Sequence, residues 1–309
     1  MKIYRIKKLP IATSKINRSV CVGLFDGLHR GHQQLVKKTV AFAKENNLKA
    51  SMFTFDPSPK NFIFKRNYPH LMSLELKAKI AASLGVEELI VLEFNQAVAD
   101  LSPEQFITKI IKPLNIKKLV VGYDFTYGKK GAGNAKTLLS LKKPGFDVEV
   151  IEEIDYQKQK ISSTRTLAAI NDGNVKLATK LLGRPYTIEG KVIHGNGNGK
   201  KIGFPTANLN IGDYALPKTG VYAVSILFEG KKYHGMANIG IHPTIKQIAK
   251  PLLEVNLFKF DRDIYGKTVE VSFIEYLRPE QKFPSLKALI KQLKRDQVQV
   301  IGLLKKLDK

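Results

Sequence analysis

The chain has 309 residues, of which 51 are Lys or Arg and 27 are Asp or Glu, so its formal net charge is +24. Its 43% hydrophobic and 25% charged residues are typical of a soluble globular protein and exclude a disordered or fibrous chain. No apolar run reaches the ~18 residues of a membrane helix, the start lacks a secretory pattern, and the single cysteine, Cys21, excludes an intrachain disulfide. We therefore expect a cytoplasmic protein of about two domains with no membrane partner.

The positive charge leaves two kinds of partner open. A basic surface attracts polyanions, so a nucleic-acid-binding protein is one candidate. The lysines are dispersed along the chain, however, without an arginine-rich tract or a nucleic-acid motif. Nucleotide substrates benefit from the same positive field, and the sequence favours them over nucleic acid.

The first half of the chain alternates predicted strands and helices, which indicates a parallel sheet covered on both faces. A strand from Ser19 is followed by a glycine-rich turn and a helix that ends near Asn46. Further strands are expected at 49–55, 88–94, 118–122 and 147–152, and further helices at 74–84 and after a capping box that begins at Ser102. Polar turns at 27–32, 56–58 and 124–128 each follow a strand, so we expect them to meet at the carboxyl edge of the sheet.

The second half has the pattern of short antiparallel strands. A helix from Asn174 to Leu182 is expected to end at Gly183, and Arg184-Pro185 then breaks the pattern, so we place the domain boundary after residue 183. Strands are predicted at 187–194, 221–228, 232–238, 252–258 and 267–274, with a hairpin turn at Glu229-Gly230. This pattern predicts a small β-barrel, because closure removes exposed strand edges, and a terminal helix is expected over 285–307.

The turn after the first strand has the features of a phosphate site. Its glycines allow close backbone approach, and the start of the next helix presents free N–H groups to an anion. His29 and His32 can donate hydrogen bonds without carrying a permanent charge. The alternative is a core strand followed by a turn with two exposed histidines. The pattern Gly-x-Phe-Asp-Gly-x-His-x-Gly-His resembles the nucleotide-binding turn of the adenylyltransferase superfamily.

A second glycine-rich stretch runs from His194 to Asn208. It lacks the spacing of a Walker A loop and of a dinucleotide fingerprint. If the end of the stretch is extended, Thr206 and Asn208 face the same side as oxygen ligands suited to Mg²⁺. The alternative is a glycine-rich hairpin with a polar end.

This stretch resembles the Gly-x-Pro-Thr-Ala-Asn motif of riboflavin kinases, and Gly220-Val-Tyr-Ala-Val, His242-Pro-Thr and Leu253-Glu-Val-Asn follow in that family's order. With the N-terminal motif, the resemblance covers nearly the whole chain and is to the bacterial bifunctional riboflavin kinase/FMN adenylyltransferases, also called FAD synthetases. It implies a Rossmann-like nucleotidyltransferase domain at residues 1–183 and an antiparallel riboflavin kinase barrel at 184–309.

The resemblance implies two reactions. In the barrel, riboflavin attacks the γ-phosphate of ATP, with Glu254 as the base and Thr206 and Asn208 as Mg²⁺ ligands. In the first domain, FMN attacks the α-phosphate of a second ATP to give FAD and pyrophosphate, and His29 and His32 stabilise the transition state. The implied nucleotide-binding residues are Gly23, Phe25, Asp26, Gly31, Asp124, Ser163, Thr164, Arg165, Gly197, Gly199 and Gly203.

Several of these residues also have an ordinary structural interpretation. Ser163 and Thr164 are suited to capping a helix. Glu254 is one acid in an apolar strand, and an inward-facing acid there is costly unless it is paired, which favours a functional role.

Three departures from the family pattern lie in the adenylyltransferase half: Ser58 replaces a His, Asn134 an acidic or similar polar residue, and Leu167 an Arg. Milder ones in the kinase half are Lys200 for an Arg and Asn256 for a His. They leave open the alternative of a riboflavin kinase whose adenylyltransferase half is weak or inactive.

Overall fold

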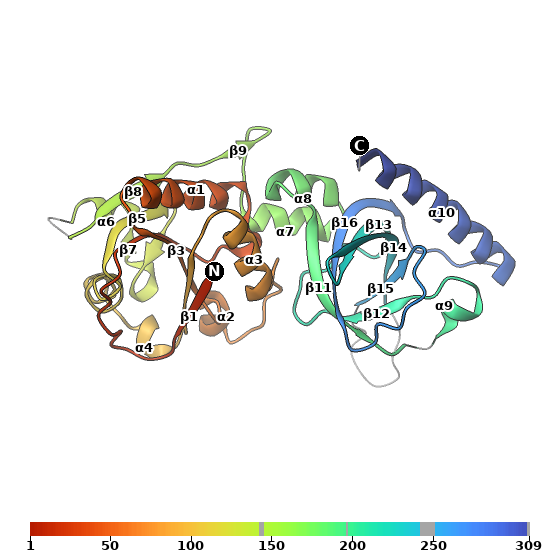
Figure 1. Ribbon diagram of the computed structural model, residues 1–309, viewed down its shortest axis with the longest axis horizontal. Coiled ribbons are helices and arrows are strands. Elements are labelled where there is room, and N and C mark those ends of the chain that lie inside the picture. The colour runs from red at the N-terminus through yellow and green to blue at the C-terminus, as the bar shows by residue number, and fades with distance from the viewer. Residues whose placement is uncertain (142–144, 196, 242–250, 308–309) are drawn as a thin grey trace. The chain divides into compact units, whose positions relative to one another are not determined.

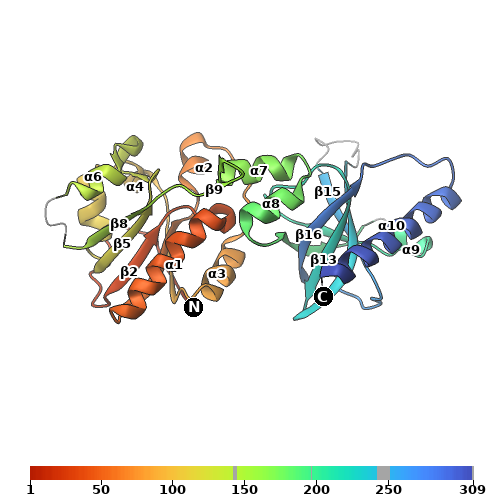
Figure 2. The same ribbon diagram turned by 90° about the horizontal axis from the view of Figure 1, so that it is seen from above.

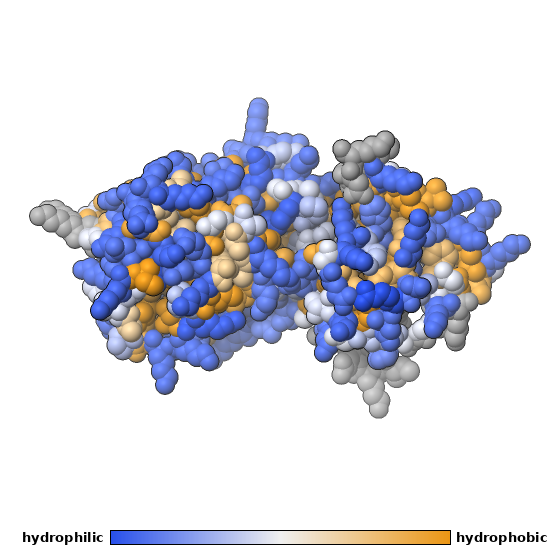
Figure 3. All heavy atoms as spheres, viewed as in Figure 1, coloured by the Kyte–Doolittle hydropathy of each residue, from blue (hydrophilic) through white to orange (hydrophobic). Residues whose placement is uncertain are grey.

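The computed structural model describes residues 1–141, 145–195, 197–241 and 251–307 (Figure 1). Asn196 of the second glycine-rich stretch and the His242-Pro-Thr motif lie outside these ranges. The described residues form two compact units, 1–68 with 74–162 and 69–73 with 163–309. Hydrophilic side chains cover much of the face seen in Figure 3, in keeping with the dispersed lysines of the sequence.

The first unit is built on a parallel sheet of six strands in the order β1-β4-β3-β2-β5-β8. The strands are β1 (Lys2–Ile6), β2 (Arg18–Val22), β3 (Lys49–Phe55), β4 (Glu88–Leu92), β5 (Ile116–Gly122) and β8 (Asp147–Ile151). β2 and β4 are buried along their whole length, and after Arg18-Ser19 and Glu88 they continue as apolar runs without alternation. The predicted parallel sheet is therefore confirmed.

Helices cover this sheet. The longest, α1 (Arg30–Glu45), packs across β2, β3 and β5 with Leu35, Val36 and Val40 buried (Figure 2). The capping box at Ser102 is present, with Gln105 as its partner. The other helical segments are α2 (Pro59–Phe64), α3 (Leu74–Ser83), α4 (Gln96–Ala99), α5 (Pro103–Phe106), a π-helical turn (Ile107–Ile111) and α6 (Ala135–Leu139). Two short hairpins complete the unit, β6 (Thr126–Tyr127) with β7 (Gly133–Asn134) and β9 (Asp155–Tyr156) with β10 (Gln159–Lys160).

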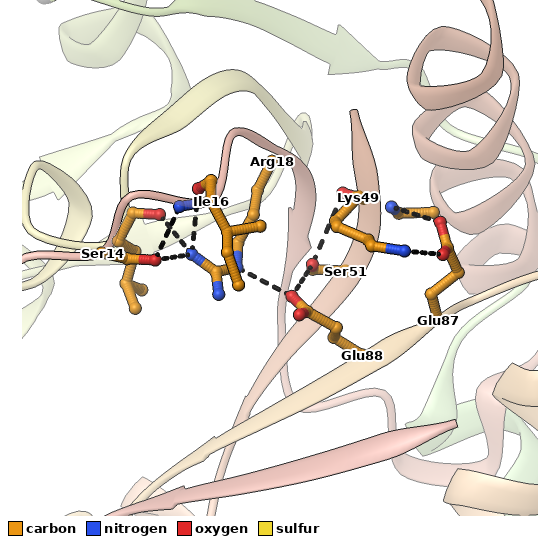
Figure 4. A network of polar contacts seen from close by, with 9 residues as sticks. Ser14, Ile16, Arg18, Lys49, Ser51, Glu87 and Glu88 are labelled. Carbon is orange, nitrogen blue, oxygen red and sulfur yellow. Dashed lines mark hydrogen bonds and ion pairs between the residues drawn. The ribbon is translucent and has the colours of Figure 1, made fainter. Parts of the chain in front are cut away.

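A buried ion pair fixes the amino edge of the sheet (Figure 4). Arg18 Nε donates to Glu88 Oε2 at 2.8 Å, and both side chains are about 5% exposed. The Arg18 guanidinium also donates to the Leu114 carbonyl at 2.8 Å, and Ser51 Oγ donates to Glu88 Oε2 at 2.9 Å. Arg18 and Glu88 are the first residues of β2 and β4. The network therefore lies at the edge opposite to the carboxyl ends of the strands, where ligands bind.

The second unit is a closed antiparallel barrel in the order β11-β12-β15-β14-β13-β16 (Figure 1). Its strands are β11 (Tyr186–Ile193), β12 (Ala207–Asn210), β13 (Gly220–Phe228), β14 (Lys231–Ile241), β15 (Pro251–Leu257) and β16 (Thr268–Arg278), and a short helix, α9 (Asn198–Lys201), precedes β12. Glu229 and Gly230 have positive φ, as the predicted hairpin turn requires. The barrel and the terminal helix α10 (Leu286–Leu307) are confirmed.

Two helices that precede the barrel in the sequence belong to its core. These are α7 (Ser163–Asn171) and α8 (Val175–Leu182), which ends at Gly183 in the left-handed conformation. Ile170, Val175 and Leu182 pack with the barrel's inner side chains. The second compact unit therefore contains residues 69–73 and 163–183 besides the barrel and its terminal helix.

Candidate active sites

The turn after β2 lies at the switch point of the parallel sheet. The chain passes from β2 through β3 to β4 on one side, and from β5 to β8 on the other. Ligands of open α/β sheets bind at the carboxyl ends of the strands beside such a reversal. The turns after β3, β2 and β5 are neighbours there, as predicted for residues 56–58, 27–32 and 124–128.

The backbone of this turn is strained. Phe25, Gly27 and Leu28 have φ values of 51°, 73° and 41°, in the left-handed region. Phe25 and Leu28 have 0% exposure, so buried packing fixes two residues with a Cβ in a conformation that costs about 1–2 kcal/mol each. Strain that is held by packing is typical of ligand-binding turns. A Cβ added at Gly23 would lie 3.4 Å from the Phe25 ring, an ordinary van der Waals contact, so the space beside the ring does not by itself require glycine.

His29 and His32 form a stacked pair at the start of α1. Their ring centroids are 3.7 Å apart, and the rings are inclined by 16°. His29 Nδ1 accepts a hydrogen bond from the His32 backbone N–H at 3.3 Å, so His29 is the N-cap of the helix. Because Nδ1 accepts, the neutral His29 ring has its proton on Nε2. A Cβ at Gly31 would lie 3.1 Å from two atoms of this ring, so a larger residue at this position would crowd His29.

The surroundings of His32 keep its ring neutral. Burial is the main cause that lowers the His32 pKa well below 6.5, and electrostatic interactions with His29 and Lys77 lower it further. His32 Nδ1 is buried and has no hydrogen-bond partner within the described parts of the chain. A neutral imidazole beside a helix N-terminus is suited to donating a hydrogen bond to a phosphate oxygen.

Asp124, which follows β5, takes part in an ion pair. Its Oδ2 accepts from Lys160 Nζ at 2.7 Å, and the Lys160 ammonium lies 4.5 Å from the centroid of the Tyr123 ring. Any nucleotide group that binds the Asp124 carboxylate competes with this ion pair. The pair could not be predicted from the sequence, because Lys160 lies in the short hairpin of β9 and β10, far from Asp124 along the chain.

Ser163, Thr164 and Arg165 form the first turn of α7 in the second unit. The helix begins at Ser163, so Ser163 and Thr164 occupy its first two positions and not the cap. The backbone N–H groups in the first turn of a helix take their hydrogen-bond acceptors from outside the helix.

The three departures in the adenylyltransferase half have structural roles. Ser58 caps α2 by accepting from the Asn61 backbone N–H at 3.2 Å. Asn134 caps α6 in a capping box with Thr137. Leu167 lies on α7 and packs against the core cluster of the barrel unit, so an arginine there would face apolar side chains.

The second site is a polar row across three strands of the barrel. In the register, Asn208 of β12 is paired with Glu254 of β15, and Glu254 is paired with Asn238 of β14. Directly paired residues lie on the same face of a sheet. Leu253 and Val255 point into the barrel core, so Glu254 points outward with the two asparagines. The expectation of an inward-facing acid is wrong, because period-two alternation places the apolar neighbours of Glu254 inside.

The glycine-rich stretch lies close to this row. A Cβ at Gly195 would collide with the Asn208 amide, and a Cβ at Gly199 would collide with the Phe204 carbonyl and lie 3.2 Å from Thr206 Oγ1. The backbone of the stretch therefore approaches both predicted Mg²⁺ ligands. Gly197 and Gly203 have positive φ, 68° and 79°, which favours glycine at the two bends.

A cavity of about 740 Å³ opens beside the stretch, between residues 202–205, 256–261 and one side of α10. Asn256 Nδ2 donates to the Pro205 carbonyl at 2.6 Å and fixes the turn before Thr206. Phe204, Phe258 and Phe260 give the cavity aromatic walls, and Lys294 of α10 adds a positive charge.

Helix α10 is anchored beside the cavity by an ion pair. Arg278, at the end of β16, donates from Nη2 to Asp296 Oδ2 at 2.7 Å and from Nε at 3.0 Å. Asp296 is 2% exposed and also accepts from Gln292 at 2.8 Å. Val300 and Leu304 pack the same helix against the outside of the barrel.

Comparison with known proteins identifies both units. A family model described as FAD synthetase matches residues 11–165, and one described as riboflavin kinase matches residues 182–304. The chain is 37% identical over 305 residues to the bifunctional riboflavin kinase/FMN adenylyltransferase of Listeria monocytogenes, covering 97% of each chain. It is 39% identical over 295 residues to that of Bacillus subtilis, covering 94% of this chain and 93% of the relative.

The fold is similar to that of a crystal structure from Streptococcus pneumoniae described as a macrolide-efflux protein. The TM-score is 0.87 at 36% identity, and the match covers 96% of this chain and 98% of the other. Within the described residues, no helix has both the length and the apolar character needed to cross a membrane. Because matches to both halves are present, nothing favours the alternative of a riboflavin kinase alone. The chain therefore belongs to the bifunctional riboflavin kinase/FMN adenylyltransferases, enzymes that convert riboflavin to FMN and FMN to FAD.

Proposed function

We propose that Glu254 is the general base of the kinase reaction, because it lies between Asn208 and Asn238 on one face of the barrel sheet. The carboxylate points out of the barrel toward the side that the glycine-rich stretch approaches. It accepts the proton of the riboflavin 5′-hydroxyl as the hydroxyl oxygen bonds to the γ-phosphorus of ATP and the bond to ADP breaks. The two amides position the carboxylate and the substrate oxygens.

Thr206 and Asn208 are proposed as Mg²⁺ ligands. A hydroxyl and an amide oxygen next to a carboxylate are hard donors that fit this ion. The described residues contain no cluster of three or more His, Cys, Asp or Glu side chains for a metal, and Mg²⁺ commonly takes its remaining ligands from phosphate and water. When bound, the ion neutralises charge on the phosphates.

The cavity next to Pro205 is proposed as a substrate pocket. Its volume of about 740 Å³ lies within the usual range for ligand sites. Aromatic walls from Phe204, Phe258 and Phe260 suit a flat heteroaromatic ring, which riboflavin and ATP both contain. Asn256 links this pocket to the turn that carries Thr206 through its hydrogen bond to the Pro205 carbonyl.

Adenylylation is proposed at the turn after β2. An FMN phosphate oxygen bonds to the α-phosphorus of ATP while the bond to pyrophosphate breaks. His29, His32 and the N-terminus of α1 donate hydrogen bonds to the charge that develops on the α-phosphate. Gly23, Phe25, Asp26 and Gly31 shape the turn, and we propose that Asp124 contributes to nucleotide binding. For Ser163, Thr164 and Arg165 a role in nucleotide binding is proposed from the sequence motif alone.

Substitution of Glu254 by Gln tests the kinase assignment. Glu254→Gln keeps the size of the side chain and removes the proton acceptor, so FMN formation should fall about 10²–10⁴-fold. Glu229→Gln is the matched control, because Glu229 lies in the exposed β13–β14 hairpin and pairs with Arg262. FMN supplied to Glu254→Gln should still be converted to FAD. An unchanged rate of FMN formation would exclude Glu254 as the base.

A further inference from the structure

Lys77 is a buried cation next to the adenylylation turn. It lies on α3, and only 8% of the residue is exposed. Its Nζ donates to the Leu24 carbonyl at 2.7 Å and to Thr54 Oγ1 at 3.4 Å. Thr54 Oγ1 itself donates to the same Leu24 carbonyl at 3.2 Å. Two side chains from two elements thus fix one carbonyl, which lies between Gly23 and the strained residue Phe25.

The charges around Lys77 all belong to the turns at the carboxyl edge of the sheet. The carboxylates of Asp26 and Asp56 favour the charged form of Lys77, and the charge of Lys77 in turn lowers the pKa of His32. Asp56 also pairs with Arg5 at 3.4 Å, where both side chains are about half exposed. Burial outweighs the two carboxylates and lowers the pKa of Lys77 to about 8.

No carboxylate hydrogen-bonds to this ammonium anywhere in the described parts of the chain. The two acceptors of Nζ are a carbonyl and a hydroxyl, and an ammonium has three N–H donors. Burying a charge without a direct counter-ion is costly. An anion that binds at the turn, where the N-terminus of α1 and the two histidines also face, would compensate this charge.

We propose that Lys77 is a positioning residue of the adenylylation reaction, which fixes the Leu24 carbonyl and supplies a stationary positive charge beneath the Gly23–His32 turn. The inference rests on the proposed role of His29 and His32. The ammonium stabilises the bound triphosphate through space and keeps the His32 ring neutral, so that the ring acts as a hydrogen-bond donor. A neutral side chain at this position would leave the turn folded but would weaken its attraction for the phosphates.

Three variants separate the charge from the hydrogen bond. Lys77→Met removes both, Lys77→Gln removes the charge but keeps an N–H donor, and Lys77→Arg keeps the charge. Lys79→Met is the matched control, since Lys79 lies on the same helix and is exposed. FAD formation from FMN and ATP is measured against pH. FMN formation from riboflavin by the same samples checks the barrel unit, and thermal unfolding shows whether the first unit of each variant is folded.

We expect Lys77→Met and Lys77→Gln to lower kcat/KM for FAD formation at least about tenfold, while Lys77→Arg and Lys79→Met stay close to the parent. The groups that face His32 are His29 from the same helix end and Lys77 from α3. Loss of the Lys77 charge raises the His32 pKa, so the acid limb of the pH profile should move to higher pH. A twofold or smaller change in both neutral variants would overturn the proposal. An acid limb that does not move, with Lys77→Arg as impaired as Lys77→Met, would leave Lys77 with a purely structural role and also overturn it.

The adenylylation site itself is tested separately by His32→Ala. If His32→Ala loses FAD formation while the neutral Lys77 variants keep it, the inference about Lys77 fails and the proposed function stands. If His32→Ala keeps FAD formation at the parent rate, the proposed role of the histidines fails first.

Discussion

Replacement of Gly31 by Ala should separate stability from activity in the first unit. A Cβ at this position would lie 3.1 Å from Nδ1 and Cε1 of His29, closer than the 3.4 Å at which ordinary contacts begin. The His29 ring must therefore move by about 0.3 Å. The stacked His32 ring, whose centroid lies 3.7 Å from that of His29, limits the direction of this movement. The hydrogen bond from the His32 N–H to His29 Nδ1 is already 3.3 Å, so the same movement away from the helix would lengthen it to about 3.6 Å and break it.

Two effects on stability then oppose each other. Losing the cap costs about 0.5–2 kcal/mol, while Ala in place of a helical Gly gains up to about 1 kcal/mol. We expect the free energy of unfolding to change by about 1 kcal/mol or less. The rate of FAD formation should fall about 10²-fold, because a displaced His29 no longer donates to the α-phosphate.

The assay is FAD formation from FMN and ATP, with FMN formation from riboflavin as the internal reference. Gly302→Ala is the matched control, because Gly302 lies in α10 with no neighbouring atom within 4 Å of an added Cβ. It should leave both reactions unchanged. A Gly31→Ala enzyme that makes FAD within twofold of the parent rate would refute the reasoning about the His29 ring.

Three other predictions concern the second unit. Asn256→Ala removes the hydrogen bond to Pro205 and should raise KM for a kinase substrate several-fold, whereas an unchanged KM and kcat would show that the turn needs no such support. Leu167→Arg should lower the melting temperature by several degrees and give no gain in FAD formation, because the side chain packs against the barrel core. A fragment of residues 163–309 should melt at a higher temperature than one of residues 184–309, which lacks α7 and α8, and equal melting temperatures would show that these helices add nothing to the barrel.

Features with a strong local signal were predictable from the sequence. Buried strands of parallel sheets contain apolar runs without alternation, and β2 from Val20 and β4 from Leu89 show this pattern. The capping box at Ser102 and the glycine after α8 also lie where the sequence predicted them. Each of these signals depends on a few neighbouring residues and on no distant contact.

Two strands had no readable signal. β1, Lys-Ile-Tyr-Arg-Ile, is a mostly exposed edge strand that pairs with β4, and its mixed composition fits a loop as well as a strand. β12 has four residues, too few for a period to be recognised. Only the register shows that β12 brings Asn208 opposite Glu254.

Tertiary burial could not be predicted for the charged residues. A lysine in the sequence Leu-Glu-Leu-Lys is usually a solvated residue on a helix, yet packing of α3 against the turn buries Lys77. Asn238 lies in an apolar strand, and nothing local relates it to Glu254. Such residues become visible only when distant strands and helices are brought together.

The most direct test of two independent sites is a mixing experiment with His32→Ala and Glu254→Gln. Each purified variant is incubated with riboflavin, ATP and Mg²⁺, alone and together, and FMN and FAD are resolved over time. We expect His32→Ala alone to stop at FMN, Glu254→Gln alone to leave riboflavin unconverted, and the mixture to make FAD, because FMN released by one variant is adenylylated by the other. A mixture that accumulates FMN without FAD, from two folded proteins, would contradict the assignment of Glu254 to the first reaction alone, and FAD made by His32→Ala alone would contradict the assignment of His32 to the second.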